Sequence, residues 1–288
     1  MKQFPTGLGF WIAFHPMAHT RAAKSGYSRS WDGVADHMCL LGAKWVAVRV
    51  PGELVSNTPN SVKAILDAFG ARGIGVYAWY YSYPGQRINE VAKIVQYQHN
   101  GLAGCFVDAE IEWTNHHQDA VVFGHDVRQH CPDFYVAHAP LGWKQYHPNW
   151  PYAEFGEWCD SVHPQMYWTE LKNGSYKDMV DNAIPEWEKL VSVGDAAAKV
   201  FCPIGVTYGN GDVFTQIQPP GKITTKDVNA WLEYTQPHNT DSPFSASSLY
   251  SYEVMPHDID MTIRAYYEAT RVGLAGAEVG PTEDGSNG

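Results

Sequence analysis

Residues 101–113 read GLAGCFVDAEIEW, an apolar run that ends in alternating acidic side chains. Successive side chains of a β-strand point to opposite faces, so a strand over Cys105–Trp113 projects Asp108, Glu110 and Glu112 to one side. The intervening apolar side chains project to the other side, toward covering helices. The segment therefore predicts an inner strand whose end carries carboxylates.

Similar strand-like runs alternate with helix-period segments along the whole chain. The eight predicted strands are Leu8–Phe14, Trp45–Val50, Gly75–Tyr81, Cys105–Trp113, Phe134–Ala139, Ser161–Trp168, Val200–Thr207 and Ser248–Val254. Eight strand–helix units joined by right-handed crossovers close into a barrel. An open doubly wound sheet is the competing topology, but no Gly-rich phosphate turn follows any strand. We predict an α/β fold, a single (β/α)8 TIM barrel over residues 1–274, followed by a flexible acidic tail over 275–288.

The composition excludes several functional classes. With 20 basic and 31 acidic side chains the net charge is −11, which repels nucleic acid and anionic membranes, so neither is an expected partner. The 5 cysteines are scattered, which argues against a disulfide framework. Because the sequence starts without an apolar leader, we expect synthesis in the cytoplasm without a signal peptide. The site of action stays open between the cell wall after release and a phage particle.

Three carboxylates at one strand end repel one another, which raises the pKa of at least one of them. A carboxylic acid that keeps its proton near neutral pH is what a glycosidase needs to protonate a departing sugar oxygen. The alternative is a solvated strand end whose carboxylates pair with Lys or Arg. The inward phase and the hydrophobic flanks favour the enzyme, and the spacing leaves open which of the three carboxylates is its acid.

The run Gly-Leu-Ala-Gly-Cys-Phe-Val-Asp-Ala-Glu resembles the fourth-strand signature of the family 18 chitinases, Gly-Phe-Asp-Gly-x-Asp-x-Asp-x-Glu. It keeps both glycines, the last aspartate as Asp108 and the catalytic glutamate as Glu110, whereas Ala103 and Phe106 stand at the first two aspartate positions. The shorter Asp-x-Glu also resembles the family 25 lysozymes, which cut bacterial peptidoglycan. The first strand lacks the aspartate of those lysozymes. The chain thus resembles a divergent member of these glycoside hydrolase barrels.

A second match lies in the predicted sixth strand, where Pro164–Trp168 resembles the Met-x-Tyr-Asp segment of the chitinases and the late Gln-Tyr pair of the lysozymes. The resemblance implies a retaining, substrate-assisted mechanism. Glu110 protonates the leaving oxygen, the 2-acetamido oxygen of the substrate attacks the anomeric carbon, and Asp108 steadies the oxazolinium ion. Tyr167 orients the acetamido group. No cofactor is implied.

A substrate without an acetamido group requires a second protein carboxylate, and the sequence leaves Glu112, Glu253 and Asp160 open for that role. Aromatic residues make up 14% of the chain, and sugar-binding clefts use such rings as platforms. The predicted substrate-binding residues are Glu112, Trp79, Tyr81, Trp113, Gln165, Trp168, Arg49 and Glu253. Trp79 could instead be an inward barrel filler, and Arg49 could simply hold its strand end.

Thirteen histidines invite a metal interpretation, notably His15 and His19 after the first strand. Their spacing of four, across Pro16 in an expected loop, does not match the ligand pair of a metal-dependent barrel, so no metal is expected. The predicted activity is hydrolysis of a β-linked N-acetylhexosamine glycan, above all peptidoglycan. The alternatives are a chitinase-like hydrolase and a catalytically silent barrel that binds glycan, which the missing aspartates favour.

Overall fold

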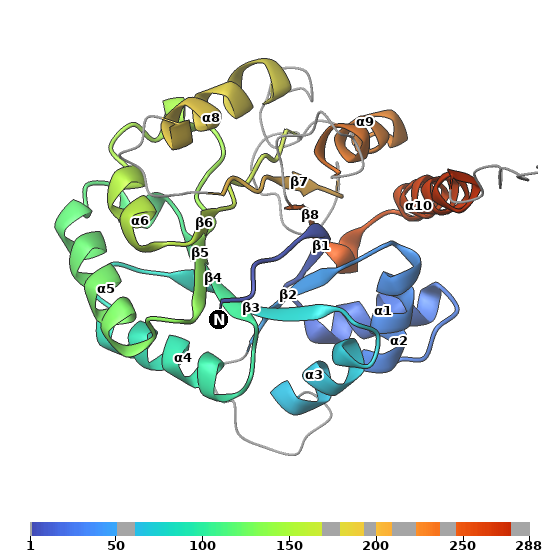
Figure 1. Ribbon diagram of the computed structural model, residues 1–288, viewed down its shortest axis with the longest axis horizontal. Coiled ribbons are helices and arrows are strands. Elements are labelled where there is room, and N and C mark those ends of the chain that lie inside the picture. The colour runs from blue at the N-terminus through green and yellow to red at the C-terminus, as the bar shows by residue number, and fades with distance from the viewer. Residues whose placement is uncertain are drawn as a thin grey trace, which may run out of the picture.

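The computed structural model describes residues 2–50, 61–168, 179–192, 200–208, 223–236 and 246–277, and these form one eight-stranded sheet. The strands follow the order β6-β5-β4-β3-β2-β1-β8-β7, and all neighbouring pairs are parallel. Isolated parallel bridges join the two edge strands, Val162 to Phe201 and Gln165 to Ile204. The sheet therefore curls closed with helices around its outside, which confirms the predicted α/β barrel (Figure 1).

All eight predicted strands are present. They are β1 Gly7–Ile12, β2 Trp45–Arg49, β3 Gly75–Ser82, β4 Gly104–Ala109, β5 Tyr135–His138, β6 Ser161–Val162, β7 Ile204–Val206 and β8 Ala246–Tyr250. Three of them end well before the predicted boundary, β4 at Ala109, β6 at Val162 and β8 at Tyr250, because the chain turns at the rim of the barrel. These shortened ends affect the site, because residues beyond the end of a strand no longer alternate between its two faces.

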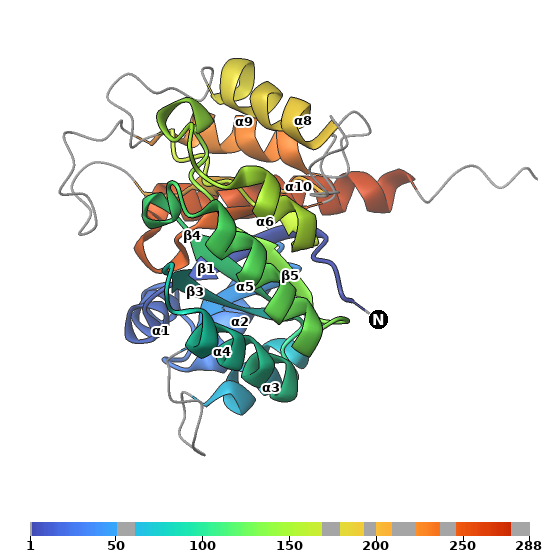
Figure 2. The ribbon, with the colours of Figure 1, turned by 90° about the vertical axis from the view of Figure 1, so that its left-hand side faces the viewer.

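The helices lie outside the sheet. They are α1 His15–Lys24, α2 Trp31–Leu40, α3 Val62–Gly70, α4 Arg87–His99, α5 His117–His130, α6 Tyr152–Trp158, α8 Ile184–Ser192, α9 Thr225–Thr235 and α10 His257–Ala277, with short helical turns η1 Ile111–Trp113, η2 Lys144–Tyr146, η3 Met179–Ala183 and η4 Tyr252–Val254. Figure 2 shows α4, α5 and α6 side by side on one flank of the barrel. None of the described helices combines the length and the apolar character needed to cross a membrane.

One expectation about these elements is wrong. The segment after the first strand is not a loop: His15 is the first residue of α1, and Pro16 suits the first turn of a helix because the N–H groups of that turn have no partner within the helix. The last helix, α10, runs through Ala277, and the division of the chain into a barrel over 1–274 and a flexible tail stays a prediction. Residues 278–288, the rest of the predicted tail, lie outside the described residues.

The aromatic content of the chain is used largely inside the barrel. The interior cluster contains Trp11, Trp45, Tyr77, Trp79, Phe106 and Tyr135. Trp45 stacks on Phe106 with their ring centroids 5.4 Å apart. A Cβ atom on Gly9 would lie 2.1 Å from the Trp45 ring, so glycine is the residue that leaves room for this indole. The N-terminal segment closes the lower mouth, where Phe4 packs on Tyr135 (Figure 1).

A buried ionic cluster ties α10 to the first two helices. Asp260 is inaccessible to solvent and accepts from Arg21 of α1 at 2.5 Å and from Arg264 of its own helix at 2.6 Å. His37 of α2 lies 3.2 Å from the same carboxylate. Hydrogen bonds from His37 and Arg264, together with the charge of Arg21, hold the pKa of Asp260 down at about 2 even though burial opposes this. The cluster therefore fixes the last helix of the barrel.

Candidate active site

A cavity of about 210 Å³ opens at the end of the barrel where the strands finish. Its walls are Trp11, Trp79, Asp108, Glu110, Ala139, Leu141, Gln165, Tyr167, Ile204, Tyr208 and Tyr250. These residues belong to β1, β3, β4, β7 and β8 or directly follow β4, β5, β6 and β7. The carboxyl ends of the strands are where barrels of this fold place their chemistry. Five predicted site residues line this cavity: Trp79, Asp108, Glu110, Gln165 and Tyr167.

The centre of the cavity is a pair of carboxyl groups bridged by one amide. Gln165 Nε2 lies 2.8 Å from Asp108 Oδ1 and 3.0 Å from Glu110 Oε1, and it also donates to the Ala139 carbonyl at 3.0 Å. Tyr81 donates its hydroxyl to the other oxygen of Glu110 at 3.3 Å. Asp108 lies in β4 and Glu110 directly follows the last residue of that strand, and both side chains line the cavity. The structure thus brings the two carboxyl groups together with Gln165, which the sequence predicted as a substrate-binding residue.

The environment of this pair favours retention of a proton. Burial raises the pKa of Asp108 well above its usual range, and the charge of Glu110 and a hydrogen bond to it raise the pKa further, against Arg49 and Gln165. Burial also raises the pKa of Glu110, although the hydrogen bonds from Gln165 and Tyr81 oppose it. Because two close carboxylates cannot both ionise cheaply in a buried site, the pair titrates as a unit that shares one proton.

Glu112, the third carboxylate predicted on the same face of the strand, lies outside the strand. The chain leaves β4 at Ala109 and enters the helical turn η1, so Glu112 is exposed rather than turned into the barrel. It still reaches the site from outside, because Tyr81 donates its hydroxyl to Glu112 Oε2 at 2.6 Å. Tyr81 therefore connects the buried pair to an exposed carboxylate.

The walls of the cavity are aromatic. Trp79 is buried and donates from Nε1 to the Ile12 carbonyl at 2.9 Å, so it both fills the barrel and forms part of the cavity wall. Tyr167 stacks on Tyr250 with ring centroids 5.6 Å apart and planes inclined by 20°. Tyr208 meets Tyr250 edge-on at 6.0 Å. Tyr208 and Tyr250 line the cavity and were not predicted as site residues.

Two predicted sugar platforms lie elsewhere. Trp113 is buried under α5, donates from Nε1 to the Ser82 carbonyl at 3.2 Å, and stacks on Phe123 at 5.9 Å. Trp168 is buried and packs on Trp231 of α9 at 5.6 Å. Neither ring lines the cavity, because each residue follows a strand that has already ended and points between sheet and helices.

Two candidates for a second catalytic carboxylate are also placed away from the cavity. Glu253 accepts the backbone N–H groups of Ala13 at 2.8 Å and Phe14 at 3.0 Å, so it holds the end of β1. Asp160 precedes β6 and therefore lies at the opposite end of the barrel, where it pairs with Arg128 at 2.8 Å. Both acidic groups serve the fold in these positions.

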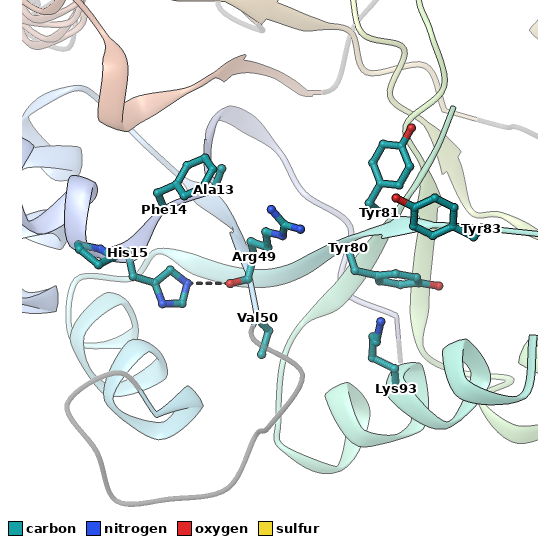
Figure 3. A pocket seen from close by; sticks show the side chains of 10 residues that line it. Ala13, Phe14, His15, Arg49, Val50, Tyr80, Tyr81, Tyr83 and Lys93 are labelled. Atoms are coloured by element: carbon teal, nitrogen blue, oxygen red, sulfur yellow. Dashed lines mark hydrogen bonds between the residues drawn. The ribbon is translucent and has the colours of Figure 1, made fainter. Parts of the chain in front are cut away.

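Arg49, the last residue of β2, lies at the rim with its side chain exposed. Its guanidinium carbon is 5.5 Å from the centre of the Trp79 ring. A second cavity of about 550 Å³ extends from here and is lined by Ala13, Phe14, His15, Pro16, Arg49, Val50, Tyr80, Tyr81, Tyr83 and Lys93 (Figure 3). We call this space the basic cavity. His15 Nε2 lies 2.7 Å from the Arg49 carbonyl and fixes the backbone there.

The buried histidines His138 and His163 are engaged in packing. His138 stacks on Trp150 at 5.7 Å on the helix side of β5, and burial lowers its pKa to about 3. His163 lies in the barrel interior, 3.1 Å from the Tyr135 hydroxyl. Across the described ranges, no group of three or more His, Cys, Asp or Glu side chains is arranged to hold a metal ion.

The fold is that of a TIM barrel. No family model matches the sequence, and no curated protein matches it either. Solved structures do resemble the chain. A chitinase from Chromobacterium violaceum aligns at 12% identity with a TM-score of 0.57, over 91% of this chain and 99% of that one.

A class V chitinase from Pseudomonas fluorescens aligns at 10% identity with a TM-score of 0.59, over 91% of this chain and 100% of that one. The spore cortex-lytic enzyme of Bacillus megaterium aligns at 8% identity with a TM-score of 0.56, over 90% of this chain and 73% of that one. At these identities the likeness shows the fold alone.

Proposed function

We propose that this protein hydrolyses a β-linked N-acetylhexosamine glycan, above all peptidoglycan, with Glu110 as general acid and base. One observation carries the proposal: Asp108, which is buried, and Glu110, which is half-buried, lie together in a rim cavity and are bridged by Gln165. A raised carboxyl pKa is what proton donation to a sugar oxygen at neutral pH requires. The likeness to chitinases and to a spore cortex-lytic enzyme supports the same class of reaction.

The proposed first step breaks the glycosidic bond. In the reacting state the proton of the pair moves from Asp108 to Glu110, which leaves Asp108 ionised, and it then passes from Glu110 to the glycosidic oxygen as the bond from that oxygen to the anomeric carbon breaks. The acetamido carbonyl oxygen of the substrate forms the new bond to the anomeric carbon. Asp108, now ionised, stabilises the positive charge of the resulting oxazolinium ion.

The second step restores the enzyme. Water adds to the anomeric carbon, the carbon–oxygen bond of the oxazolinium ion breaks, and a proton of the water returns to Glu110. Two displacements at one carbon retain the β configuration. Tyr167 lines the same cavity as the carboxyl pair, where its hydroxyl orients the acetamido group. Tyr81, bonded to Glu110, holds the acid in place.

The test compares polymers and variants. Purified protein is incubated with labelled peptidoglycan and with chitin oligomers, and new reducing ends are counted. Glu110→Gln removes the proton donor, so the rate should fall by roughly 10²–10⁴-fold while oligosaccharide binding is kept. Glu157→Gln, an exposed glutamate of α6, is the matched control and should keep full activity. Normal turnover by Glu110→Gln refutes the assignment, and cleavage of chitin alone makes the protein chitinase-like.

A second candidate is a glycan-binding barrel without catalysis. Phe106 stands where the chitinase signature has an aspartate, and its ring is fully buried 4.9 Å from Trp11. Asp108 therefore has no carboxyl partner below it with which to exchange a proton. This candidate predicts that the protein binds the oligomers and releases no reducing ends from either polymer.

A further inference from the structure

The basic cavity adjoins the catalytic cavity. Tyr81 lines the basic cavity, and its hydroxyl donates to Glu110. Arg49 lines it too, and its guanidinium lies against Trp79, which forms a wall of the catalytic cavity. A glycan chain whose scissile bond sits at Glu110 therefore places its next sugar beside Arg49.

Arg49 is available to a ligand. Its guanidinium makes no ion pair and no hydrogen bond with any of the residues that the structure describes, and its side chain is exposed. Figure 3 shows it projecting into the cavity between Phe14 and Tyr81. Other arginines are occupied: Arg21, Arg72, Arg128 and Arg264 each bind a carboxylate. A planar fork of N–H donors left open at a rim is suited to bidentate binding of a carboxylate.

The other walls suit a sugar ring with a negative charge. Tyr81 and Tyr83 lie with ring centroids 5.0 Å apart, and Tyr83 is 48% exposed, so its ring is free to carry a sugar face. Lys93 places a second cation in the cavity, with its ammonium 4.6 Å from the centre of the Tyr80 ring. Two cations gather here in a chain whose net charge is −11.

We infer that the basic cavity is a subsite for a sugar that bears a carboxylate, with Arg49 as the group that binds it. The inference rests on the proposed function, because it takes a glycan held at Glu110 as the ligand. An acidic sugar needs such a cation here, since Asp108, Glu110 and Glu112 would otherwise repel it. The carboxylate can come from the lactyl ether of a muramic acid that carries no stem peptide, since a peptide's amide bond removes that charge, or from a uronic acid, and both have the same chemistry toward arginine.

The test measures binding, so that it does not depend on turnover. In the Glu110→Gln background, dissociation constants are determined by calorimetry for three tetrasaccharides: a neutral chitin oligomer, a peptide-free glycan fragment that contains muramic acid, and a hyaluronan fragment that contains uronic acid. At least one acidic oligomer should bind about tenfold or more tightly than the neutral one, as expected for one charged hydrogen-bonded pair. Adding Arg49→Gln should remove that preference, and Arg49→Lys should restore part of it.

Arg87→Gln is the charge-matched control. It lies on α4, outside the basic cavity, and should leave the preference unchanged. Which acidic oligomer binds tightly identifies the source of the carboxylate. Equal affinity for all three oligomers, or a preference that survives Arg49→Gln, overturns the inference even if the wild type hydrolyses chitin oligomers. An Arg49-dependent preference without any hydrolysis by the wild type upholds the subsite and refutes the proposed function.

Discussion

Replacing Gln165 with methionine tests whether the bridging amide sets the acidity of the carboxyl pair. The amide nitrogen lies 2.8 Å from Asp108 and 3.0 Å from Glu110, and its hydrogen bonds favour the ionised form of both. A hydrogen bond to a charged group contributes about 1.5–3 kcal/mol, and one pKa unit corresponds to about 1.4 kcal/mol. Gln165→Met should therefore raise the pKa of the pair by about one to two units.

The sign of the effect distinguishes this role from a merely structural one. Because Glu110 must be protonated to act, activity is lost as pH rises through the pKa of the pair. The variant should turn over more slowly than the wild type, but its remaining activity should persist to higher pH. The alkaline limb of the pH–rate profile therefore shifts to higher pH. The control is Gln118→Met, which changes an exposed glutamine of α5.

The assay is the pH profile of kcat/KM on an N-acetylglucosamine oligomer, together with a carbon-13 NMR titration of the carboxyl groups. The titration reads the pKa without any need for activity. An unchanged or lowered pKa in Gln165→Met, with the fold intact, refutes the reasoning that the amide stabilises the ionised pair.

Three further changes test stability. Asp108→Asn should raise the free energy of unfolding near pH 8. Because the pKa of Asp108 is raised in the fold, the stability of the wild type falls as pH rises from about 4 through that pKa, by at most about 1.4 kcal/mol per pKa unit. Urea titrations at pH 5 and pH 8 check this. Asp260 has a pKa of about 2 in the fold, so its contribution of about 2 kcal/mol to the free energy of unfolding is present above pH 4 and lost as pH falls toward 2. Asp260→Asn should abolish that acid dependence and lower the free energy of unfolding by about 3–5 kcal/mol at pH 7. Gly104→Ala places a Cβ atom 2.4 Å from the Tyr135 ring and should destabilise by about 1–3 kcal/mol in thermal unfolding, whereas Gly70→Ala, with nothing within 4 Å, should not.

The sequence was sufficient for the architecture because both periodicities are strong. Every strand was located, and the pairing of Asp108 with Glu110 followed from the period of two alone. The close approach at Gly104 also explains why glycine suits that position, since β4 lies against Tyr135 of β5. These are local rules, and they hold wherever the strand continues.

The rim could not be predicted in the same way. Alternation stops where a strand stops, so Glu112, Trp113 and Trp168 left the faces that an extended strand would give them. Tyr208 lies one residue past the predicted seventh strand, and Tyr250 sits in a strand of serines whose interior face has no apolar signal. The position of Tyr250 in its strand could have indicated its place. It is two residues after Ser248, so both face the barrel interior, where Ser248 accepts a hydrogen bond from Trp11 at 2.9 Å.

The most direct test of the central claim is proton NMR of the anomeric signals during hydrolysis of a β-linked N-acetylglucosamine oligomer. The account predicts that wild-type protein first releases the β-anomer, which then mutarotates, and that Glu110→Gln releases almost nothing. Release of the α-anomer first, or equal release by the two proteins, would contradict a retaining reaction driven by the proton of Glu110.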